Sequence, residues 1–243
     1  MDTLFVKDYD EMSQKGFEIF REVIETKENP IVSINTGGTT RGFYKLLVEA
    51  VNDGLDISNT TIFVLDEYIG PKNEVYTVYT YLHENFLDLV DTQPKEVHFI
   101  DGSIDDPDAE IERYKRLLDE HPRDFQLLGL GTNGHIGANE PGTPFDAEMF
   151  LAQHTDSTIE STMKEYDISR EKTPTAMITL GFKEILEAEK IVLMISGEHK
   201  AEATKTLIEG EVTENNPASI LQQYENATVI IDEEAASMLE KTQ

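Results

Sequence analysis

A short glycine- and threonine-rich segment is the first part of the chain that could do chemistry. It contains Thr36, Gly37, Gly38 and Thr39, with Arg41 two residues further on. Glycines let backbone N–H groups approach an anion, threonine hydroxyls add donors, and a following helix N-terminus contributes positive potential. The segment predicts a phosphate-binding turn, and a tight connection without a ligand is the alternative.

Two further segments carry groups that could transfer protons. Asp66, Glu67 and Tyr68 follow an apolar run, so a carboxylate stands where a buried strand would end. His135 lies in a glycine-rich segment, and Glu140 follows five residues later. An imidazole exchanges protons near neutral pH, and a nearby carboxylate can orient it. These residue types predict general acid–base catalysis, although Asp66 alone could merely cap a turn and a lone histidine is often structural.

Other chemistries fit these residues less well. Asp66, His135 and Glu140 could ligate zinc or manganese, but their spacing does not match the HExxH pattern of a zinc-binding helix. The GxSxG turn that carries the nucleophile of many serine hydrolases is absent from the sequence. We therefore expect no metal.

The elements that must position these residues alternate short apolar, β-branched runs with longer amphipathic stretches. This alternation predicts an α/β fold with a single open, mostly parallel, Rossmann-like sheet and helices on both faces. We expect strands at residues 31–35, 60–65, 97–100, 125–130, 176–180, 191–196 and 227–231. We expect helices at residues 9–25, 40–51, 76–89, 107–120, 183–188, 199–208 and 233–239.

The predicted topology brings the three segments to one edge of the sheet. Ligands of such sheets bind outside the carboxyl ends of the strands, and each segment directly follows a predicted strand. Residues 131–144 form a long loop rich in Gly, Asn, Thr and Pro, and loops of this length are often functional. With no repeat or evident linker, we expect one domain over residues 1–243.

Composition limits the partners and the compartment. The chain has 243 residues with 48 Asp and Glu against 20 Lys and Arg, a net charge of −28. Such a charge disfavours nucleic acid and anionic membranes, and it fits an acidic, solvated surface or adaptation to salt. The sequence has no cysteine, which excludes disulfides and thiolate chemistry. The first residues do not resemble a secretory signal, so we expect a cytoplasmic protein.

Taken together, these segments resemble the glucosamine-6-phosphate deaminase (isomerase) family, which is related to the 6-phosphogluconolactonases. The NEPG motif distinguishes the chain from the lactonases. The matching motifs, in order, are TGGT at 36–39, LDEYIG at 65–70, LGLG at 128–131, NGHI at 133–136, NEPG at 139–142, TLG at 179–181, KA at 200–201 and PAS at 217–219.

The resemblance implies a reaction and a role for each matching residue. An amino sugar 6-phosphate and water would give a ketose 6-phosphate and ammonia without a cofactor. His135, held by Glu140, would open the sugar ring, and Asp66 would move the C2 proton. The turn at residues 36–39 and Lys200 would bind the phosphate. The implied partner is a small amino sugar phosphate, and we expect a monomer or a small homo-oligomer.

Departures from the family pattern leave some points open. Asn133 replaces an aspartate found in many deaminases, and an amide can orient a neighbour but cannot transfer a proton. Met163 falls where these enzymes have a phosphate-binding arginine, so we expect Arg41 or Lys164 to replace it. The same departures resemble the galactosamine-6-phosphate isomerase branch. A lactonase and a non-catalytic sugar-phosphate sensor remain the alternative functions.

Overall fold

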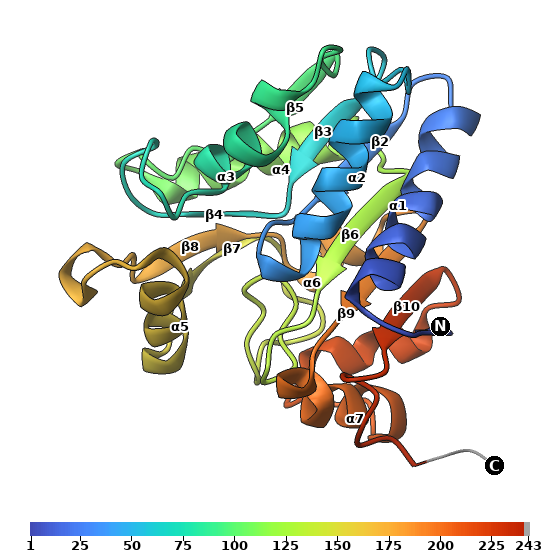
Figure 1. Ribbon diagram of the computed structural model, residues 1–243. Helices are drawn as coiled ribbons and strands as arrows, with labels where there is room; N and C mark the ends of the chain where they lie inside the picture. Colours follow the sequence, from blue (N-terminus) through green and yellow to red (C-terminus); the bar gives the residue numbers. More distant parts are fainter. Residues whose placement is uncertain (241–243) are drawn as a thin grey trace.

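A parallel β-sheet forms the centre of the protein (Figure 1). The computed structural model describes residues 1–240, and of residues 157, 161 and 165 it describes the backbone alone. Within this part of the chain, seven parallel strands follow the order β1-β10-β9-β6-β2-β3-β5. They are β1 (Asp2–Val6), β2 (Ile31–Ile34), β3 (Thr61–Val64), β5 (Glu96–His98), β6 (Phe125–Gly129), β9 (Ile191–Ile195) and β10 (Ala227–Asp232).

The central strands are apolar because both faces of the sheet are covered. Every residue of β9, with the sequence IVLMI, is buried, and so is every residue of β3. Such uninterrupted apolar runs are typical of parallel strands between two layers of helices. Aromatic side chains fill the layer beside the sheet, where the ring of Phe20 makes edge-to-face contacts with Phe43 and Phe125.

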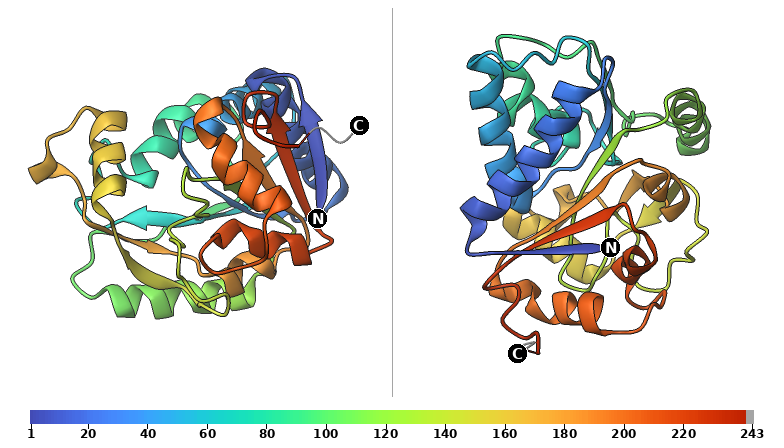
Figure 2. Two further views of the ribbon diagram at one scale, coloured as in Figure 1. Left: turned by 90° about the horizontal axis from the view of Figure 1, so that it is seen from below. Right: turned by 90° about the vertical axis from the view of Figure 1, so that its right-hand side faces the viewer.

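Helices cover both faces of the parallel sheet (Figures 1 and 2). The connections between parallel strands are right-handed, so their direction along the sheet decides which face the helix covers. The first connections run toward β5 and place α1, α2 and α3 on one face. The later ones run back toward β1 and place α4, α6 and α7 on the other face. The helices are α1 (Tyr9–Thr26), α2 (Arg41–Asn52), α3 (Val78–Asn85), α4 (Pro107–Glu120), α5 (Asp156–Tyr166), α6 (Phe182–Leu186) and α7 (Ala201–Glu209). No helix in residues 1–240 is both long and apolar enough to cross a membrane.

The start of α4 follows directly from its sequence. Asp106 is the N-cap residue, and its side chain accepts a hydrogen bond from the N–H of Ala109 at 3.2 Å. Pro107 occupies the first turn, where a missing N–H costs nothing. Ile111, Tyr114 and Leu118 recur every three or four residues and are buried, so one face of α4 packs on the sheet.

A second, smaller sheet stands beside the first (Figure 1). It is antiparallel, in the order β4 (Asp66–Tyr68), β8 (Ala176–Thr179) and β7 (Phe150–Gln153). The chain leaves β3 of the parallel sheet and enters β4 after a single residue, Leu65. Together with α5, this sheet projects from the main body, and it forms one wall of the site described below.

The predicted open, mostly parallel α/β fold is confirmed, with differences in detail. The predicted strand at residues 176–180 is present as β8, but it belongs to the antiparallel sheet. The predicted helix at residues 76–89 is shorter, because α3 ends at Asn85 and residues 87–89 form a separate 3₁₀ turn. The strands β1, β4 and β7 and the helix α5 are additional elements that the sequence patterns did not predict.

The predicted helix at residues 233–239 is wrong, because this segment forms consecutive turns. The buried side chain of Asp232 accepts hydrogen bonds from Ser196 Oγ at 2.5 Å and from the N–H of Ala235 at 2.8 Å. The N–H groups of Ser237 and Leu239 then donate to carbonyls three residues back, rather than four. Local side-chain bonding of this kind competes with the helical pattern.

Candidate active site

Two adjoining cavities lie where the carboxyl ends of the parallel strands meet the small sheet. The first, which we call the turn cavity, has a volume of about 310 Å³ and is bounded by residues 36–39, residues 129–132 and Lys200. The second, the sheet cavity, has a volume of about 210 Å³ and is bounded by β4, β7, β8 and α5. Five residues line both: Thr36, Gly37, Asp66, His135 and Gly137. This shared wall therefore holds the groups best suited to proton transfer.

The turn at residues 36–39 is shaped for an anion. Gly37 has φ 121°, a conformation that favours glycine, and a 3₁₀ turn leads from it into α2. Lys200 is buried beside the turn, and its Nζ donates to Thr39 Oγ1 at 2.7 Å. Tyr81 anchors the turn from behind, with its hydroxyl donating to the carbonyl of Gly37 at 3.1 Å. A cation and a backbone turn thus lie together in the turn cavity.

Asp66 stands at the junction of the two sheets. It is the first residue of β4 and pairs with Thr179 of β8. Burial raises the pKa of its carboxyl group to about 7, although the charge of His135 acts in the opposite direction. A carboxylate with a pKa near neutral can both accept and return a proton, which suits a group that shuttles one hydrogen.

His135 and Glu140 form a contact on the loop after β6. The Nδ1 atom of His135 lies 3.5 Å from Glu140 Oε1. Glu140 also accepts hydrogen bonds from Asn133 Nδ2 at 2.6 Å and from Thr158 Oγ1 at 3.1 Å. Burial raises the pKa of Glu140, but its contacts with His135, Asn133 and Thr158 outweigh burial and hold it at about 2. Glu140 is therefore a fixed negative charge beside the imidazole.

Gly131 makes room for the ring of His135. A Cβ atom at this position would lie 2.4 Å from the imidazole, closer than any side chain allows. The N–H of Gly131 donates to the carbonyl of His135 at 2.9 Å, so the loop folds back on itself. Asn133 contributes a second constraint, because its Oδ1 accepts a hydrogen bond from the N–H of His135 at 3.2 Å. The loop sequence thus fixes the position of the imidazole.

Glu67 has a different role from its neighbour Asp66. It is buried and points away from the cavities, toward the start of α3. Its carboxylate accepts hydrogen bonds from the N–H groups of Tyr68, Val78 and Tyr79 at 2.8, 2.9 and 2.9 Å. Burial raises its pKa to about 7, against the effect of these three donors. Glu67 therefore ties β4, and with it Asp66, to the N-terminus of α3.

The structure gathers most of the residues predicted from sequence, and their roles stay predictions. Thr36, Gly37, Gly38, Thr39, Asp66, His135, Glu140 and Lys200 all line the cavities, and Asn133 bonds to Glu140. Arg41 and Lys164 are exposed and lie outside the lining of both cavities. Among the side chains that the structure describes, no group of three or more His, Asp or Glu is arranged to hold a metal ion.

Several lining residues were not predicted from the sequence, among them Thr158, Tyr166 and His154. Thr158 and Tyr166 come from α5, and His154 directly follows β7. The sequence offered one signal, the Thr155–Thr158 spacing of a helix N-cap, which marks the start of α5. It offered none for His154, because that residue joins the site only through the antiparallel pairing of β7 with β8.

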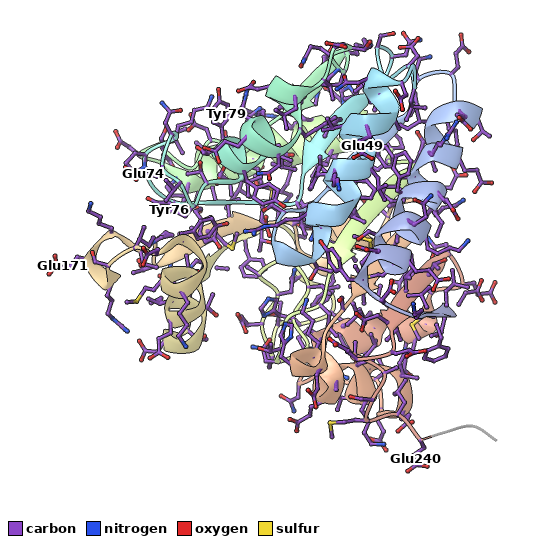
Figure 3. All side chains as sticks on the ribbon, in the orientation of Figure 1. Glu49, Glu74, Tyr76, Tyr79, Glu171 and Glu240 are labelled. Atoms are coloured by element: carbon purple, nitrogen blue, oxygen red, sulfur yellow. The ribbon has the colours of Figure 1, made fainter. Side chains whose placement is uncertain are left out.

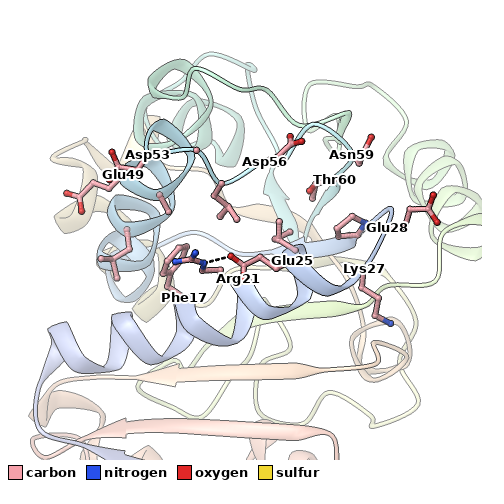
Figure 4. Close-up of a pocket in the computed structure, with 16 residues that line it drawn as sticks. Phe17, Arg21, Glu25, Lys27, Glu28, Glu49, Asp53, Asp56, Asn59 and Thr60 are labelled. Carbon is pink, nitrogen blue, oxygen red and sulfur yellow. Dashed lines mark hydrogen bonds and ion pairs between the residues drawn. The ribbon is translucent and has the colours of Figure 1, made fainter.

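Another hollow lies at the opposite, amino-end edge of the parallel sheet (Figure 4). It has a volume of about 680 Å³ and lies between the ends of α1 and α2. Acidic side chains line it, among them Glu49, Asp53 and Asp56, while Arg21 is paired with Glu25 at 2.7 Å. Acidic side chains outnumber the two basic ones, Arg21 and Lys27, in this lining, so the hollow is a poor site for an anion.

Fold and side chains together define a class: an α/β enzyme with a buried carboxyl group and an imidazole–carboxylate pair beside a glycine-rich turn that contacts a lysine. Within this class, the chain belongs to the family of glucosamine-6-phosphate isomerases and 6-phosphogluconolactonases, whose model matches residues 9–230.

Individual relatives agree with this assignment. The chain is 38% identical over 239 residues to a glucosamine-6-phosphate deaminase of Bacillus cereus (strain B4264), covering 98% of this chain and 89% of the relative. A solved structure of a monomeric glucosamine-6-phosphate deaminase superposes with a TM-score of 0.94 at 35% identity, over 98% of this chain and all of that one. The 6-phosphogluconolactonase of Trypanosoma brucei, at 18% identity and a TM-score of 0.79 over 98% and 99% of the two chains, shares the fold.

Proposed function

We propose that the chain is a glucosamine-6-phosphate deaminase, which converts glucosamine 6-phosphate and water to fructose 6-phosphate and ammonia. The observation that carries the proposal is the position of Asp66 and His135 on the wall shared by the two cavities. A substrate whose phosphate occupies the turn cavity can place its reacting carbons at that wall. The names of the relatives support the substrate.

The phosphate would bind in the turn cavity. The backbone and hydroxyl groups of Thr36 and Thr39 supply donors, and the buried ammonium group of Lys200 supplies the positive charge. A buried cation is worth more to a dianion than an exposed one, because solvent screens it less. Arg41 could add long-range attraction from its exposed position at the start of α2.

Ring opening would fall to His135. The imidazole accepts the proton of the C1 hydroxyl and returns a proton to the ring oxygen as the C1–O5 bond breaks. An imidazolium forms between the two transfers, and the Glu140 carboxylate 3.5 Å from Nδ1 stabilises it. With a pKa of about 2, Glu140 keeps its negative charge throughout.

Isomerisation and deamination would follow in the open chain. Asp66 removes the proton from C2, which gives an enolamine, and a proton is then delivered to C1. The product is an imine at C2, and addition of water releases ammonia and leaves the ketone of fructose 6-phosphate. Every step is a proton transfer or a hydrolysis, so no cofactor is required.

Two other functions, a lactonase and a non-catalytic sensor, fit these residues less well. A 6-phosphogluconolactonase is disfavoured, because the lactonase structures are 16–19% identical to this chain whereas the deaminase structure is 35% identical. A non-catalytic sensor would not need a carboxylate with a pKa near 7 beside an imidazole–carboxylate pair. The closely similar relatives named as glucosamine-6-phosphate deaminases favour the glucosamine epimer.

The test is release of ammonia. The purified protein is incubated separately with glucosamine 6-phosphate, galactosamine 6-phosphate and 6-phosphogluconolactone, and ammonia, ketose 6-phosphate and free acid are measured. We expect ammonia and fructose 6-phosphate in equal amounts from the first. A faster reaction with galactosamine 6-phosphate would reassign the epimer, and lactone hydrolysis without ammonia release would overturn the proposal.

We further propose that the protein acts as a monomer in the cytoplasm. The structural relative described as monomeric supports the first point, and the metabolic relatives from Bacillus support the second. Sedimentation at working concentrations should give a mass near 27.5 kDa. A stable larger species would contradict the monomer.

A further inference from the structure

The two cavities share Asp66 and His135 and differ in their other charged residues. The turn cavity contains the ammonium group of Lys200. Among the described residues that line the sheet cavity there is no lysine or arginine, and the lining includes the carboxylate of Glu140 and the rings of Tyr68 and Tyr166. Carboxylates and aromatic faces both attract cations. The joined cavities therefore suit a molecule with an anion at one end and a cation at the other.

His154 lines the sheet cavity and carries a buried nitrogen without a hydrogen-bond partner. Its Nδ1 atom lies 3.1 Å from the carbonyl oxygen of Pro174. Because a carbonyl only accepts hydrogen bonds, Nδ1 carries the hydrogen, and Nε2 of a neutral ring has a free lone pair. The Nε2 atom is buried and has no hydrogen-bond partner among the described residues. An unpaired acceptor on a residue that lines a cavity calls for a donor, and a ligand in that cavity can supply one after a small movement of the ring.

The surroundings of His154 keep its ring in place and uncharged. The ring of Tyr68 contacts it edge-to-face, with centroids 5.5 Å apart. Burial lowers the pKa of His154, and the charge of His135 acts in the same direction, while Pro174 and Glu140 oppose them. A neutral imidazole cannot bind an anion by charge, but it can accept a hydrogen bond from an ammonium group.

We propose that the sheet cavity is the subsite for the protonated amino group of the substrate, and that His154 Nε2 accepts a hydrogen bond from it. This inference rests on the proposed function, because it places the phosphate in the turn cavity and C2 beside Asp66. It gives His154 a role in specificity: it distinguishes an amino sugar phosphate from a sugar phosphate with a hydroxyl group at C2. A hydrogen bond to a charged donor is worth about ten- to a hundredfold in affinity.

The experiment compares two open-chain ligands that differ in one group. 2-Amino-2-deoxyglucitol 6-phosphate and glucitol 6-phosphate carry an ammonium group and a hydroxyl group, respectively, at C2. Their dissociation constants are measured by calorimetry for the wild type, His154→Phe, His154→Gln and the control His83→Phe. His83 lies on α3 outside both cavities, where it contacts Asp88 at 2.8 Å.

The inference predicts a change in the ratio of the two dissociation constants. The wild type and His83→Phe should bind the amino compound more tightly, and His154→Phe should lose about tenfold or more of this preference while binding glucitol 6-phosphate as before. His154→Gln, whose amide oxygen can accept a hydrogen bond, should recover part of it. An unchanged ratio in His154→Phe would overturn the inference.

A measurement on the unmodified protein covers the case in which His154→Phe does not fold. In ¹⁵N NMR spectra, the Nε2 signal of His154 should move toward the hydrogen-bonded range with the amino compound and much less with glucitol 6-phosphate. Equal shifts with both would count against the subsite. Failure of the proposed function is distinguishable, because the wild type would then release no ammonia, whatever the ligand ratios show.

Discussion

At the scale of single residues, Asp66 is subject to two opposing effects. Burial disfavours its charged form and raises its pKa to about 7, while the nearby charge of His135 favours the carboxylate. The result is a carboxyl group whose protonation state changes near neutral pH. The same burial makes the ionised form costly to the fold, as is common at catalytic positions.

This cost predicts a pH-dependent stability difference for Asp66→Asn. The pKa of Asp66 is raised in the folded state, so the carboxyl group costs nothing below pH 4, where it is protonated in both states, and it costs most above pH 7. Urea unfolding should show Asp66→Asn more stable than the wild type by about 1–3 kcal/mol at pH 8, with the difference shrinking toward pH 4.

The control for these unfolding measurements is Asp91→Asn, which changes an exposed carboxylate away from the cavities. Its unfolding free energy should follow that of the wild type across the pH range. If Asp66→Asn gave the same difference at pH 4 and pH 8, the raised pKa of Asp66 would be wrong.

Lys200 and Arg41 can be ranked as phosphate-binding cations. Lys200 is buried in the turn cavity, and Arg41 is exposed outside it. We expect Lys200→Met to raise the KM for the sugar phosphate by about ten- to a hundredfold, because the partner charge is little screened there. Arg41→Met should raise it less.

Lys190→Met serves as the control for this pair, since Lys190 contacts Glu22 on the surface at 3.2 Å and should leave KM unchanged. A larger rise for Arg41→Met than for Lys200→Met would show that the main phosphate contact lies at the start of α2, and that the buried lysine is not the principal cation.

At the scale of elements, local patterns predicted the parallel layer and missed the small sheet. Apolar runs such as residues 191–195 are long enough to identify a buried strand, and each is followed by its own helix or turn. The strand β4 has only three residues, Asp66–Tyr68, two of them acidic. Its extended form comes from pairing with β8, about 110 residues later in the chain, and local propensity carries no information on such a pairing.

The residues of the site also separate into those carried by the parallel sheet and those carried by the small sheet and α5. The connections that leave the carboxyl ends of β3, β6 and β9 carry Asp66, His135 and Lys200, respectively. Ligands of open α/β sheets bind at these strand ends, and this rule alone groups the three residues. His154 and Thr158 reach the cavity from β7 and α5, whose placement depends on the antiparallel sheet. Sequence patterns therefore predicted that Asp66, His135 and Lys200 lie together, and they did not predict the wall formed by β7 and α5.

Glu67 links these elements, and its removal should affect both stability and catalysis. Glu67→Ala leaves three N–H groups, one buried and two partly buried, without their acceptor and frees β4 from α3. We expect the unfolding free energy to fall by about 2–4 kcal/mol, measured by urea denaturation at pH 7. We also expect kcat to fall, because Asp66 lies next to Glu67 on the loosened strand.

Glu74→Ala provides the comparison, since Glu74 lies on the same connection but is exposed. It should change the unfolding free energy by less than about 0.5 kcal/mol. Equal effects of the two substitutions would mean that the carboxylate of Glu67 is not what holds β4 to α3.

At the scale of the whole molecule, the net charge of −28 is a property of the surface. Labelled acidic side chains such as Glu49, Glu74, Glu171 and Glu240 extend outward from the body (Figure 3). Like charges at this density repel one another and disfavour the compact state, and salt screens the repulsion over about 10 Å at 0.1 M. The few buried cations, Lys200 among them, stand out against this background.

Salt should therefore stabilise the protein. Raising NaCl from about 0.05 M to about 0.5 M should increase the unfolding free energy by about 1–2 kcal/mol, measured by urea denaturation at pH 7.5. The triple variant Glu49→Gln, Glu74→Gln, Glu171→Gln should be more stable at low salt and respond less to added salt. A loss of stability with salt would show that attractive ion pairs outweigh the repulsion.

The central claim, that Asp66 moves the C2 proton of an amino sugar phosphate, is tested most directly with glucosamine 6-phosphate deuterated at C2. The wild type should release ammonia with a primary isotope effect, and deuterium from C2 should appear in water or at C1 of the product. Asp66→Asn should bind the sugar phosphate yet lower kcat by about 10²- to 10⁴-fold. Ammonia release by Asp66→Asn at the wild-type rate would contradict it.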